Sequence, residues 1–361
     1  MSKSSLLALA SIALLVAVAL LLRGTGTVVE PPPTLSLERA ADGVDALARS
    51  FPPPGDAPLV WPGDHAAKTE QFAESWIVAG LVEGESGERV GFQLVFYRLA
   101  AQPEAAERES AWATRDVYRA RLVVEPAGGK PVAEERLSRS ALGLAGSDSD
   151  PAGVWVEDWR ASIDGDSGAI RLSASTAGAG LDFRVETSGT APVPVDAELY
   201  RGFWWPGLRV TGRLQFEGRE MAVTGHAMME RLWGRGLPAG RGQLALARLW
   251  FDLGDGAAVR CEQLRRRAGG GTPVTECIAY PASLGEGITM APADTSRPAR
   301  TASSYPARWI VALPASGEVL RIEPLSAGPS LPAAGAWSAI VVADGAPQRW
   351  GLLELSNFAP P

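Results

Sequence analysis

Histidine and cysteine are scarce in this chain of 361 residues, which contains two of each. The histidines, His65 and His226, are far apart, and no group of cysteines and histidines has the spacing of zinc ligands. No Walker loop is present, and the glycine-rich stretches lie between β-type runs, where no helix N-terminus is available to bind phosphate. No G-x-S-x-G motif precedes a helix. These absences argue against a metal site, a nucleotide cofactor and an ordinary serine hydrolase, and we expect neither metal nor cofactor.

Lysine is also rare, since only Lys3, Lys68 and Lys130 are found among 34 basic residues. The 41 acidic residues outnumber the basic ones, so the formal net charge is -7. An acidic protein has no general attraction to nucleic acid, and we expect no nucleic-acid partner. With 46% hydrophobic residues, the chain is globular and long enough for two domains.

The N-terminus carries a long hydrophobic run. Lys3 precedes an apolar stretch over residues 6–22 that only Ser11 interrupts, and Arg23 follows it. This pattern predicts a signal peptide or a membrane anchor over residues 1–23. A helix of this length spans roughly 26 Å, slightly less than a ~30 Å hydrocarbon core, so length does not separate the two. No clear small-x-small cleavage site follows the run, which favours an anchor that holds a periplasmic or otherwise extracytoplasmic protein at the cytoplasmic membrane.

The next segment, residues 24–58, reads as a linker and a short amphipathic helix over residues 35–49, which a run of prolines ends. From there the sequence shows pairs of β-type runs separated by turn residues, which predict antiparallel hairpins. The expected hairpins join residues 76–83 with 89–99, 170–176 with 181–187, 208–216 with 219–229, 243–253 with 258–267, 308–313 with 319–325, and 337–343 with 349–358.

The spacing of these runs, about sixteen strands in all, is typical of β-barrels or sandwiches and not of alternating strands and helices. A glycine-rich stretch over residues 234–242 is the best place to divide the β region. We therefore expect an all-β fold with one domain at residues 59–233 and a second at residues 234–361.

The two cysteines, Cys261 and Cys277, are equally distant from Gly269 in the sequence, within β-type runs that a glycine-rich turn separates. A hairpin at this turn would place them opposite each other. We expect a disulfide in an oxidising compartment, and two unpaired buried thiols are the alternative.

Eight short motifs follow one another in a recognisable order. They are WPGDH at residues 61–65, ESW at 74–76, GFQLVFYR at 91–98, EERLSRSALGLAG at 134–146, VWVEDW at 154–159, VTGHAMMERLW at 223–233, YPARW at 305–309 and WGLLELSNF at 350–358. Together they resemble the carotenoid 1,2-hydratase family, also called hydroxyneurosporene synthase, with its AttH-like secreted relatives. The resemblance implies two lipocalin-like antiparallel β-barrels packed together, which handle an isoprenoid or another lipidic molecule.

The chain departs from the family's polar motifs. The family's Glu-Trp-Trp-Tyr run is Glu74-Ser75-Trp76-Ile77 here, and its Trp-Met-Asp-His-Glu-Trp run falls on residues 228–233, where the histidine is lost. Three further family positions change: a Trp-Asp-Trp pattern falls on Leu246-Ala247-Arg248, a histidine on Arg121, and the acid of a Trp-Glu-Gly on Ser338. Losing several polar positions at once predicts that the hydratase reaction is not performed.

The remaining polar and aromatic residues define the candidate site. Hydration of an isolated double bond needs an acid that protonates carbon, aromatic rings that stabilise the cation, and an oriented water. Glu230 is the candidate acid, and His226 shares its strand parity and therefore its face. The candidate ligand-binding residues are Glu74, Trp76, Asp158 and Trp233. The alternative for Glu74 and Asp158 is a structural role, in which they pair with arginines such as Arg98, Arg136 or Arg139.

Three functions remain open from the sequence. The first is a non-catalytic module that binds or presents a hydrophobic ligand outside the cytoplasm. The second is a divergent lyase or hydrolase that uses Glu230. The third is an accessory subunit of a membrane transport complex. An apolar cavity with a lone carboxylate would favour the enzyme, a cavity without one the binding module, and a filled interior the accessory subunit.

Overall fold

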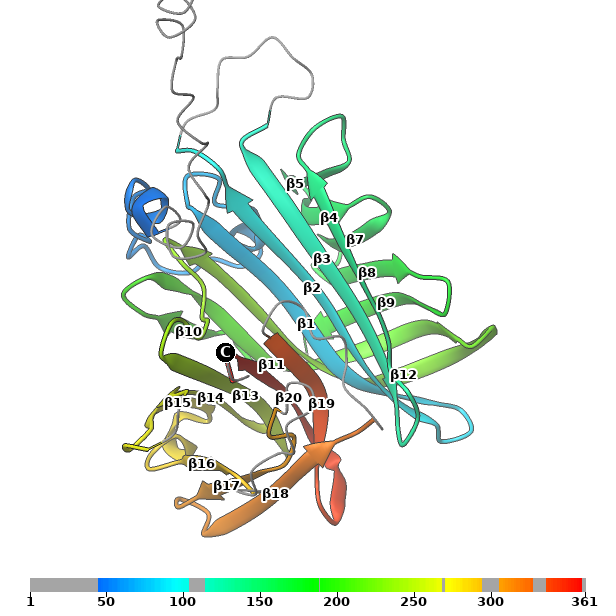
Figure 1. The fold of residues 1–361 in the computed structure, drawn as a ribbon. Coiled ribbons are helices and arrows are strands. Elements are labelled where there is room, and N and C mark those ends of the chain that lie inside the picture. The colour runs from blue at the N-terminus through cyan, green and yellow to red at the C-terminus, as the bar shows by residue number, and fades with distance from the viewer. Residues whose placement is uncertain are drawn as a thin grey trace, which may run out of the picture. The chain divides into compact units, whose positions relative to one another are not determined.

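The computed structural model of the protein describes residues 45–103, 114–187, 189–267, 270–293, 305–326 and 336–358. The predicted signal peptide or anchor over residues 1–23, and the linker up to residue 44, lie outside these described residues. Residues 45–49 are helical, at the end of the helix expected over residues 35–49. None of the helices among the described residues is long and apolar enough to cross a membrane. From Leu47 onward the chain forms one compact unit, and its architecture is all-β, as expected (Figure 1).

The first sheet has twelve antiparallel strands, in the order β4-β3-β2-β1-β12-β11-β9-β8-β7-β6-β5, with β10 paired to β11. Its two end strands, β4 and β5, contact each other, so the sheet is a nearly closed barrel. A short 3-10 helix, η1 (Gly63–His65), precedes it. The strands are β1 (Ala73–Gly84), β2 (Arg89–Ala100), β3 (Asp116–Pro126), β4 (Val132–Arg139), β5 (Ala145–Ser149), β6 (Ala152–Val156), β7 (Trp159–Ile163), β8 (Ile170–Ser175), β9 (Ala179–Thr187), β10 (Val193–Asp196), β11 (Tyr200–Phe216) and β12 (Arg219–Gly234).

The second sheet has eight antiparallel strands, in the order β15-β14-β13-β20-β19-β18-β17-β16. A second 3-10 helix, η2 (Ala282–Leu284), lies between β15 and β16. The strands are β13 (Leu244–Gly254), β14 (Ala257–Arg266), β15 (Val274–Tyr280), β16 (Thr289–Pro292), β17 (Trp309–Leu313), β18 (Glu318–Pro324), β19 (Ala336–Ala343) and β20 (Ala346–Ser356). All six hairpins expected from the sequence are present as antiparallel pairs.

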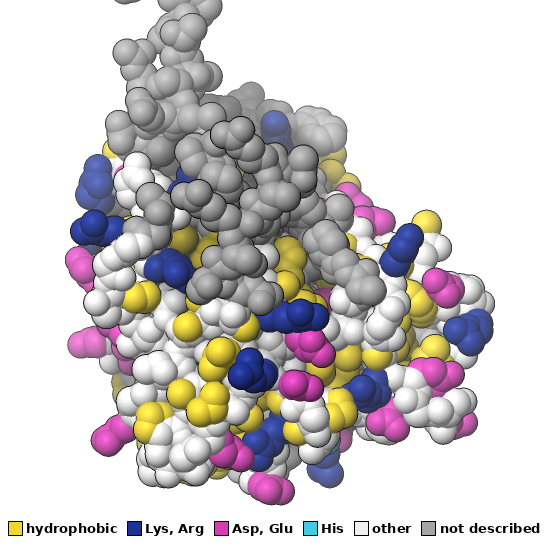
Figure 2. All heavy atoms as spheres, turned by 60° about the horizontal axis from the view of Figure 1, so that its bottom comes forward, with side chains coloured by type: hydrophobic (Ala, Val, Ile, Leu, Met, Phe, Trp, Pro, Cys, Tyr) yellow, Lys and Arg dark blue, Asp and Glu magenta, His cyan; other side chains and the backbone are white. Residues whose placement is uncertain are grey.

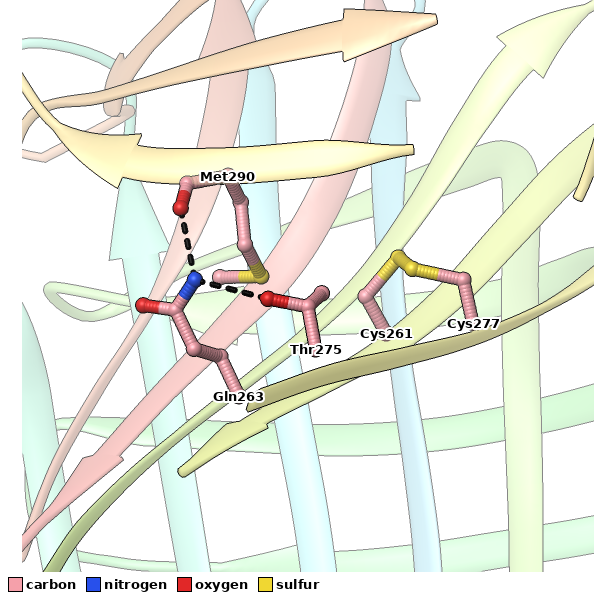
Figure 3. Close-up of a disulfide and its surroundings, with 5 residues drawn as sticks. All are labelled: Cys261, Gln263, Thr275, Cys277 and Met290. Carbon is pink, nitrogen blue, oxygen red and sulfur yellow. Dashed lines mark hydrogen bonds between the residues drawn. A yellow bond between two sulfur atoms is a disulfide. The ribbon is translucent and has the colours of Figure 1, made fainter. Parts of the chain in front are cut away.

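The gap between the end strands β15 and β16 is bridged by one side chain. The amide Nε2 of Gln263 on β14 donates to the backbone oxygen of Met290 on β16 and to Oγ1 of Thr275 on β15 (Figure 3). Beside this bridge, Cys261 and Cys277 face each other in the β14–β15 register and form a disulfide. The Gln263–Met290 bond therefore crosses the gap that the backbone ladder leaves open, and the disulfide strengthens the adjoining β14–β15 pair.

The two barrels share a buried seam. Strands β19 and β20 pack against β1 (Figure 1), and β1 is buried along both faces because each face meets a different core. Trp76, Val78 and Val82 face the first barrel's own core. The side chains of the seam come from both barrels: Ile77, Ala79, Leu81, Val95, Val195, Trp204, Met228 and Leu232 from the first, and Trp250, Ala258, Leu325, Ile340, Val342, Trp350 and Leu352 from the second or its connections.

Close approach at the seam depends on Gly91 of β2. A Cβ atom at Gly91 would lie 2.7 Å from Cγ1 of Ile340, closer than two carbon atoms can approach without displacement. The missing side chain therefore lets the second barrel lie directly on β2. The face of the described surface drawn in Figure 2 mixes basic, acidic and apolar side chains, and no patch of a single charge stands out there.

Candidate functional site

A pocket of about 340 Å³ opens where the two barrels meet. Most of its lining is apolar, and its guanidinium groups come from strands of both barrels. Two of its leucines, Leu99 and Leu137, are 48% and 72% exposed, so the pocket has apolar surface open to solvent. The lining residues are Tyr97, Leu99, Val117, Arg119, Arg121, Leu137, Leu237, Pro238, Ala239, Arg248, Ala336, Trp337, Ser338, Glu354, Leu355 and Ser356.

Arg121 on β3 is the basic residue of the pocket with neutral hydrogen-bond partners. Its Nη2 donates to Oε1 of Gln93 at 3.0 Å and to Oγ of Ser338 on β19 at 2.7 Å, so it spans the two barrels. Oε1 of Glu354 is 3.9 Å from Nη2, beyond hydrogen-bonding distance. Its Nε is buried and has no hydrogen-bond partner among the described residues.

Arg248 on β13 is instead saturated by carboxylates. It donates to Glu230 and to Oε2 of Glu354, the latter at 2.6 Å, and its Nε is 3.3 Å from Oε1 of Glu262. Arg260 on β14 contacts Glu230 and Glu262 at 2.7 and 2.6 Å. Burial alone would lower the pKa of Arg248, but these carboxylates outweigh it and raise that pKa well above its ordinary value. The cluster lies between the barrels and holds three carboxylates, of Glu230, Glu262 and Glu354, against the two guanidinium groups.

Tyr97 supplies a hydrogen-bond donor to the pocket. Burial, helped by the nearby Glu354 carboxylate, raises the pKa of Tyr97 to about 12, so the phenol keeps its proton at physiological pH. No hydrogen bond from the phenol to another described residue is present. Its ring lies 5.9 Å from the guanidinium carbon of Arg119, a residue whose charge is paired with Glu135.

A second titratable group at the seam is Glu125 on β3, which is fully buried. Its carboxyl accepts hydrogen bonds from Gln93 Nε2, from Ser326 Oγ and from the backbone N–H of Ile340 on β19. Burial raises the pKa of Glu125 from an ordinary value near 4.5 to about 7, and these hydrogen bonds offset only part of the rise.

The predicted catalytic pair is not assembled. Glu230 is fully buried at the seam, and each of its oxygens is occupied by a guanidinium donor, from Arg248 and Arg260. It does not line the pocket. His226 has the expected strand parity but is exposed, and four residues of strand place it roughly 13 Å from Glu230. That strand face is buried at Met228 and Glu230 and exposed at His226, so shared parity does not bring the two side chains to one site.

Three of the predicted ligand-binding residues, Glu74, Trp76 and Trp233, come together inside the first barrel. Glu74 is fully buried and binds Nε of Arg98 at 2.5 Å, a guanidinium nitrogen of Arg231, and the backbone N–H of Lys68 at 2.8 Å. Burial opposes its charged form, but Arg231 and Arg98 outweigh that effect and lower the pKa of Glu74.

The two tryptophans flank the same arginine, whose guanidinium carbon lies 3.9 Å from the Trp76 ring and 5.3 Å from the Trp233 ring. Trp76 donates its Nε1 hydrogen to the backbone oxygen of His65, which closes this side of the cluster. Burial and the Arg231 charge lower the pKa of His65 to about 3, so its ring stays neutral. The described pockets are not lined by Glu74, Trp76 or Trp233, and the arrangement ties strands together.

Asp158 lies elsewhere, between β6 and β7, with a side chain that is 64% exposed. It pairs with Arg136, one of the arginines named as its structural alternative. The structure therefore separates Asp158 from Glu74, Glu230 and the pocket. Among the described residues, no group of three His, Cys, Asp or Glu side chains could hold a metal ion.

A model of the AttH-like family matches residues 52–357, which is most of the chain. The chain belongs to the AttH-like family. No curated protein matches it. The more specific resemblance to carotenoid 1,2-hydratases stays a prediction.

Three solved structures share the fold of this AttH-like protein. AttH from Nitrosomonas europaea is 22% identical, with a TM-score of 0.70 over 86% of this chain and 100% of its own. Kievitone hydratase from Nectria haematococca is 12% identical, with a TM-score of 0.55 over 85% and 95%. CghA with Sch210972 is 14% identical, with a TM-score of 0.53 over 87% and 97%. At these identities the likeness concerns the fold alone.

Sequence reasoning named none of the pocket residues as ligand-binding, yet a signal was available. Arg121, Arg248 and Ser338 are three of the positions at which the chain departs from the hydratase motifs, and all three line the pocket. Strands from both barrels bring them together, with Arg121 and Ser338 separated by 217 residues. Tyr97 lies within the GFQLVFYR motif, and its role depended on the second barrel being in place.

Proposed function

We propose that this AttH-like protein binds a hydrophobic ligand, an isoprenoid or another lipid, in the pocket between its barrels. The observation that supports this is the apolar pocket itself, whose volume of about 340 Å³ lies within the ~300–1,000 Å³ range of small-molecule sites. Exposed leucines on its lining, Leu99 and Leu137, are the surface that an apolar chain would cover.

We propose further that the protein does not hydrate its ligand. Protonation of a carbon–carbon double bond requires an acid within reach of the substrate. The oxygens of Glu230 are occupied by Arg248 and Arg260, and His226 lies roughly 13 Å along the strand. The alternative, a divergent hydratase-like lyase, has no such acid on the pocket lining, where the single carboxylate, Glu354, is bound to Arg248.

Binding can be tested on protein freed of lipid by solvent extraction, with a long-chain apolar probe. Mass spectrometry of the extract from natively purified protein should show a bound lipid. The probe should raise the melting temperature by mass action. Ala336→Trp fills the pocket and should abolish the rise, whereas Ala222→Trp on the exposed face of β12 should not. An empty extract together with no shift in the wild type would overturn the proposal.

Catalysis has a separate test. Acyclic carotenoids incubated with the protein should be recovered unhydrated, and Glu230→Gln should leave probe binding nearly intact. Turnover in the wild type that disappears in Glu230→Gln would reject the non-catalytic proposal and establish the lyase.

We also propose an extracytoplasmic location, with residues 6–22 as an anchor in the cytoplasmic membrane. It is supported by the apolar run and by the Cys261–Cys277 disulfide, because disulfides persist in oxidising compartments. The intact mass of membrane-fraction protein should include residue 1 or 2. A mass that begins after residue 20 would show cleavage, and recovery in the cytoplasm would exclude the location.

A further inference from the structure

One buried arginine of this protein, Arg121, differs from the others in its hydrogen-bond partners. Arg98, Arg201, Arg231, Arg248 and Arg260 each have a carboxylate oxygen within 3.3 Å. Arg121, which is 7% exposed, has the amide oxygen of Gln93 and the hydroxyl of Ser338 instead. Of the buried arginines among the described residues, it is the one whose charge no carboxylate contacts at hydrogen-bonding distance.

A buried guanidinium without a close counter-ion is costly, because desolvation is not repaid by attraction. Glu354 is the nearest carboxylate: its Oε2 binds Arg248, and its Oε1 lies 3.9 Å from Nη2 of Arg121, which is an ion pair without a hydrogen bond. Glu125 is held by its own donors from Gln93, Ser326 and Ile340. Arg121 therefore lacks a charge-assisted hydrogen bond, which a ligand in the pocket that it lines can supply.

We propose that the ligand is an amphipathic organic acid, whose carboxylate binds Arg121 while its apolar chain covers Trp337, Leu99 and Leu137. This inference rests on the proposed function, since it names the chemical class of the ligand of that pocket. A carboxylate accepts charge-assisted hydrogen bonds from a guanidinium group, and the Tyr97 phenol on the same lining is a further donor. Of the three arginines on the lining, Arg119 and Arg248 already bind carboxylates, so Arg121 is the guanidinium available to an anionic ligand.

Fatty acids and oxidised isoprenoids share this chemistry. Two matched pairs of probes separate them: a saturated long-chain acid with its alcohol, and a branched isoprenoid acid with its alcohol. In protein freed of lipid, the acid of the accepted chain type should bind about 10- to 100-fold tighter than the alcohol, the value of a hydrogen bond to a charged group. Titration calorimetry at pH 7.5 measures all four.

The matched variants are Arg121→Gln and Arg119→Gln. Arg121→Gln should reduce the preference for acid over alcohol to less than threefold, and the Ser338 hydroxyl still bonds Gln93 in its absence. Arg119→Gln removes one charge of the same sign from the pocket lining and should leave most of the preference. If Arg121→Gln does not fold, the wild-type preference must still disappear as pH falls below the ~4–5 pKa of a carboxylic acid.

The outcomes separate the two proposals. Equal binding of acid and alcohol overturns the anionic ligand and leaves a hydrophobic-ligand protein. Binding of no probe in the wild type overturns the proposed function as well. An acid preference that survives Arg121→Gln but is lost in Arg119→Gln also rejects Arg121 as the anion site.

Discussion

Two buried carboxylates, Glu74 and Glu230, each bind two arginines, but their surroundings differ. Glu74 lies within the first barrel, where the other hydrogen bonds of Arg231 go to backbone oxygens, of Ser75, Leu232 and Ala66. Glu230 lies between the barrels, where its arginines share further carboxylates. The first cluster is closed and lines no described pocket, whereas the second borders a pocket at which Arg121 remains without a close carboxylate. The first cluster is therefore expected to maintain the fold, and the open contact of the second supports the proposal that a ligand binds at the seam.

The largest expected effect is that of Glu74→Gln. The substitution leaves Arg231 buried without a carboxylate, while Arg98 keeps Asp116 at 2.5 Å. Removing one partner of a buried ion pair costs about 3–5 kcal/mol, so the free energy of unfolding should fall by that amount in denaturant titrations. Glu135→Gln, which removes the partner of half-exposed Arg119, is the control and should change it by less than ~0.5 kcal/mol. A loss below ~1 kcal/mol in Glu74→Gln would mean that the first cluster does not maintain the fold.

Reduction of the Cys261–Cys277 disulfide should have the second-largest effect on stability. It should destabilise the second barrel alone. The bond joins residues 16 apart, and closing such a loop contributes roughly 3 kcal/mol in the chain-entropy model. Reductant should lower the melting temperature and speed hydrogen exchange in β15 and β16, with β1 and β12 unchanged. Two free thiols titrated in untreated protein would contradict this, as would equal loss of protection in both barrels.

Glu230→Gln should cost less than Glu74→Gln. Arg248 keeps Glu262 and Glu354, and Arg260 keeps Glu262, so no guanidinium is left without a carboxylate. We expect a loss of about 1–3 kcal/mol from weakened hydrogen bonds, measured under the same denaturant conditions. Equal losses of unfolding free energy in Glu74→Gln and Glu230→Gln would show that the two clusters do not differ in how their arginines are paired.

The smallest expected effect is a pH dependence of stability caused by Glu125, which is buried between the barrels. Because the pKa of Glu125 is raised to about 7 in the folded protein, its contribution to stability is fully present below pH ~4.5 and is lost as pH rises through 7. Glu125→Gln should lack this decline, so its stability relative to the wild type should increase between pH 5 and 8. Chemical denaturation of both proteins across this range measures the difference. Parallel stability curves would show that Glu125 does not titrate there.

The hairpins and the all-β class could be predicted from the sequence, because turn residues and strand runs are local signals. Alternation of residues along a strand indicates which side chains share a face, as for Met228 and Glu230, but not what covers that face. On β12 this face is buried at Met228 and Glu230 and exposed at His226. The structure therefore places the two residues of the predicted catalytic pair apart, and their catalytic role stays a prediction.

The sequence by itself determined the strands, the facing positions of Cys261 and Cys277, and the positions that depart from the hydratase motifs. Only the tertiary structure decided that Glu74 closes a cluster inside one barrel while Arg121 and Ser338 meet across two. The physical reason is that a side chain's role in this fold depends on its charge partners. Glu74 meets Arg231, 157 residues away, through the pairing of β1 with β12 inside the first barrel, whereas Arg121 meets Ser338, 217 residues away, only because one barrel packs on the other.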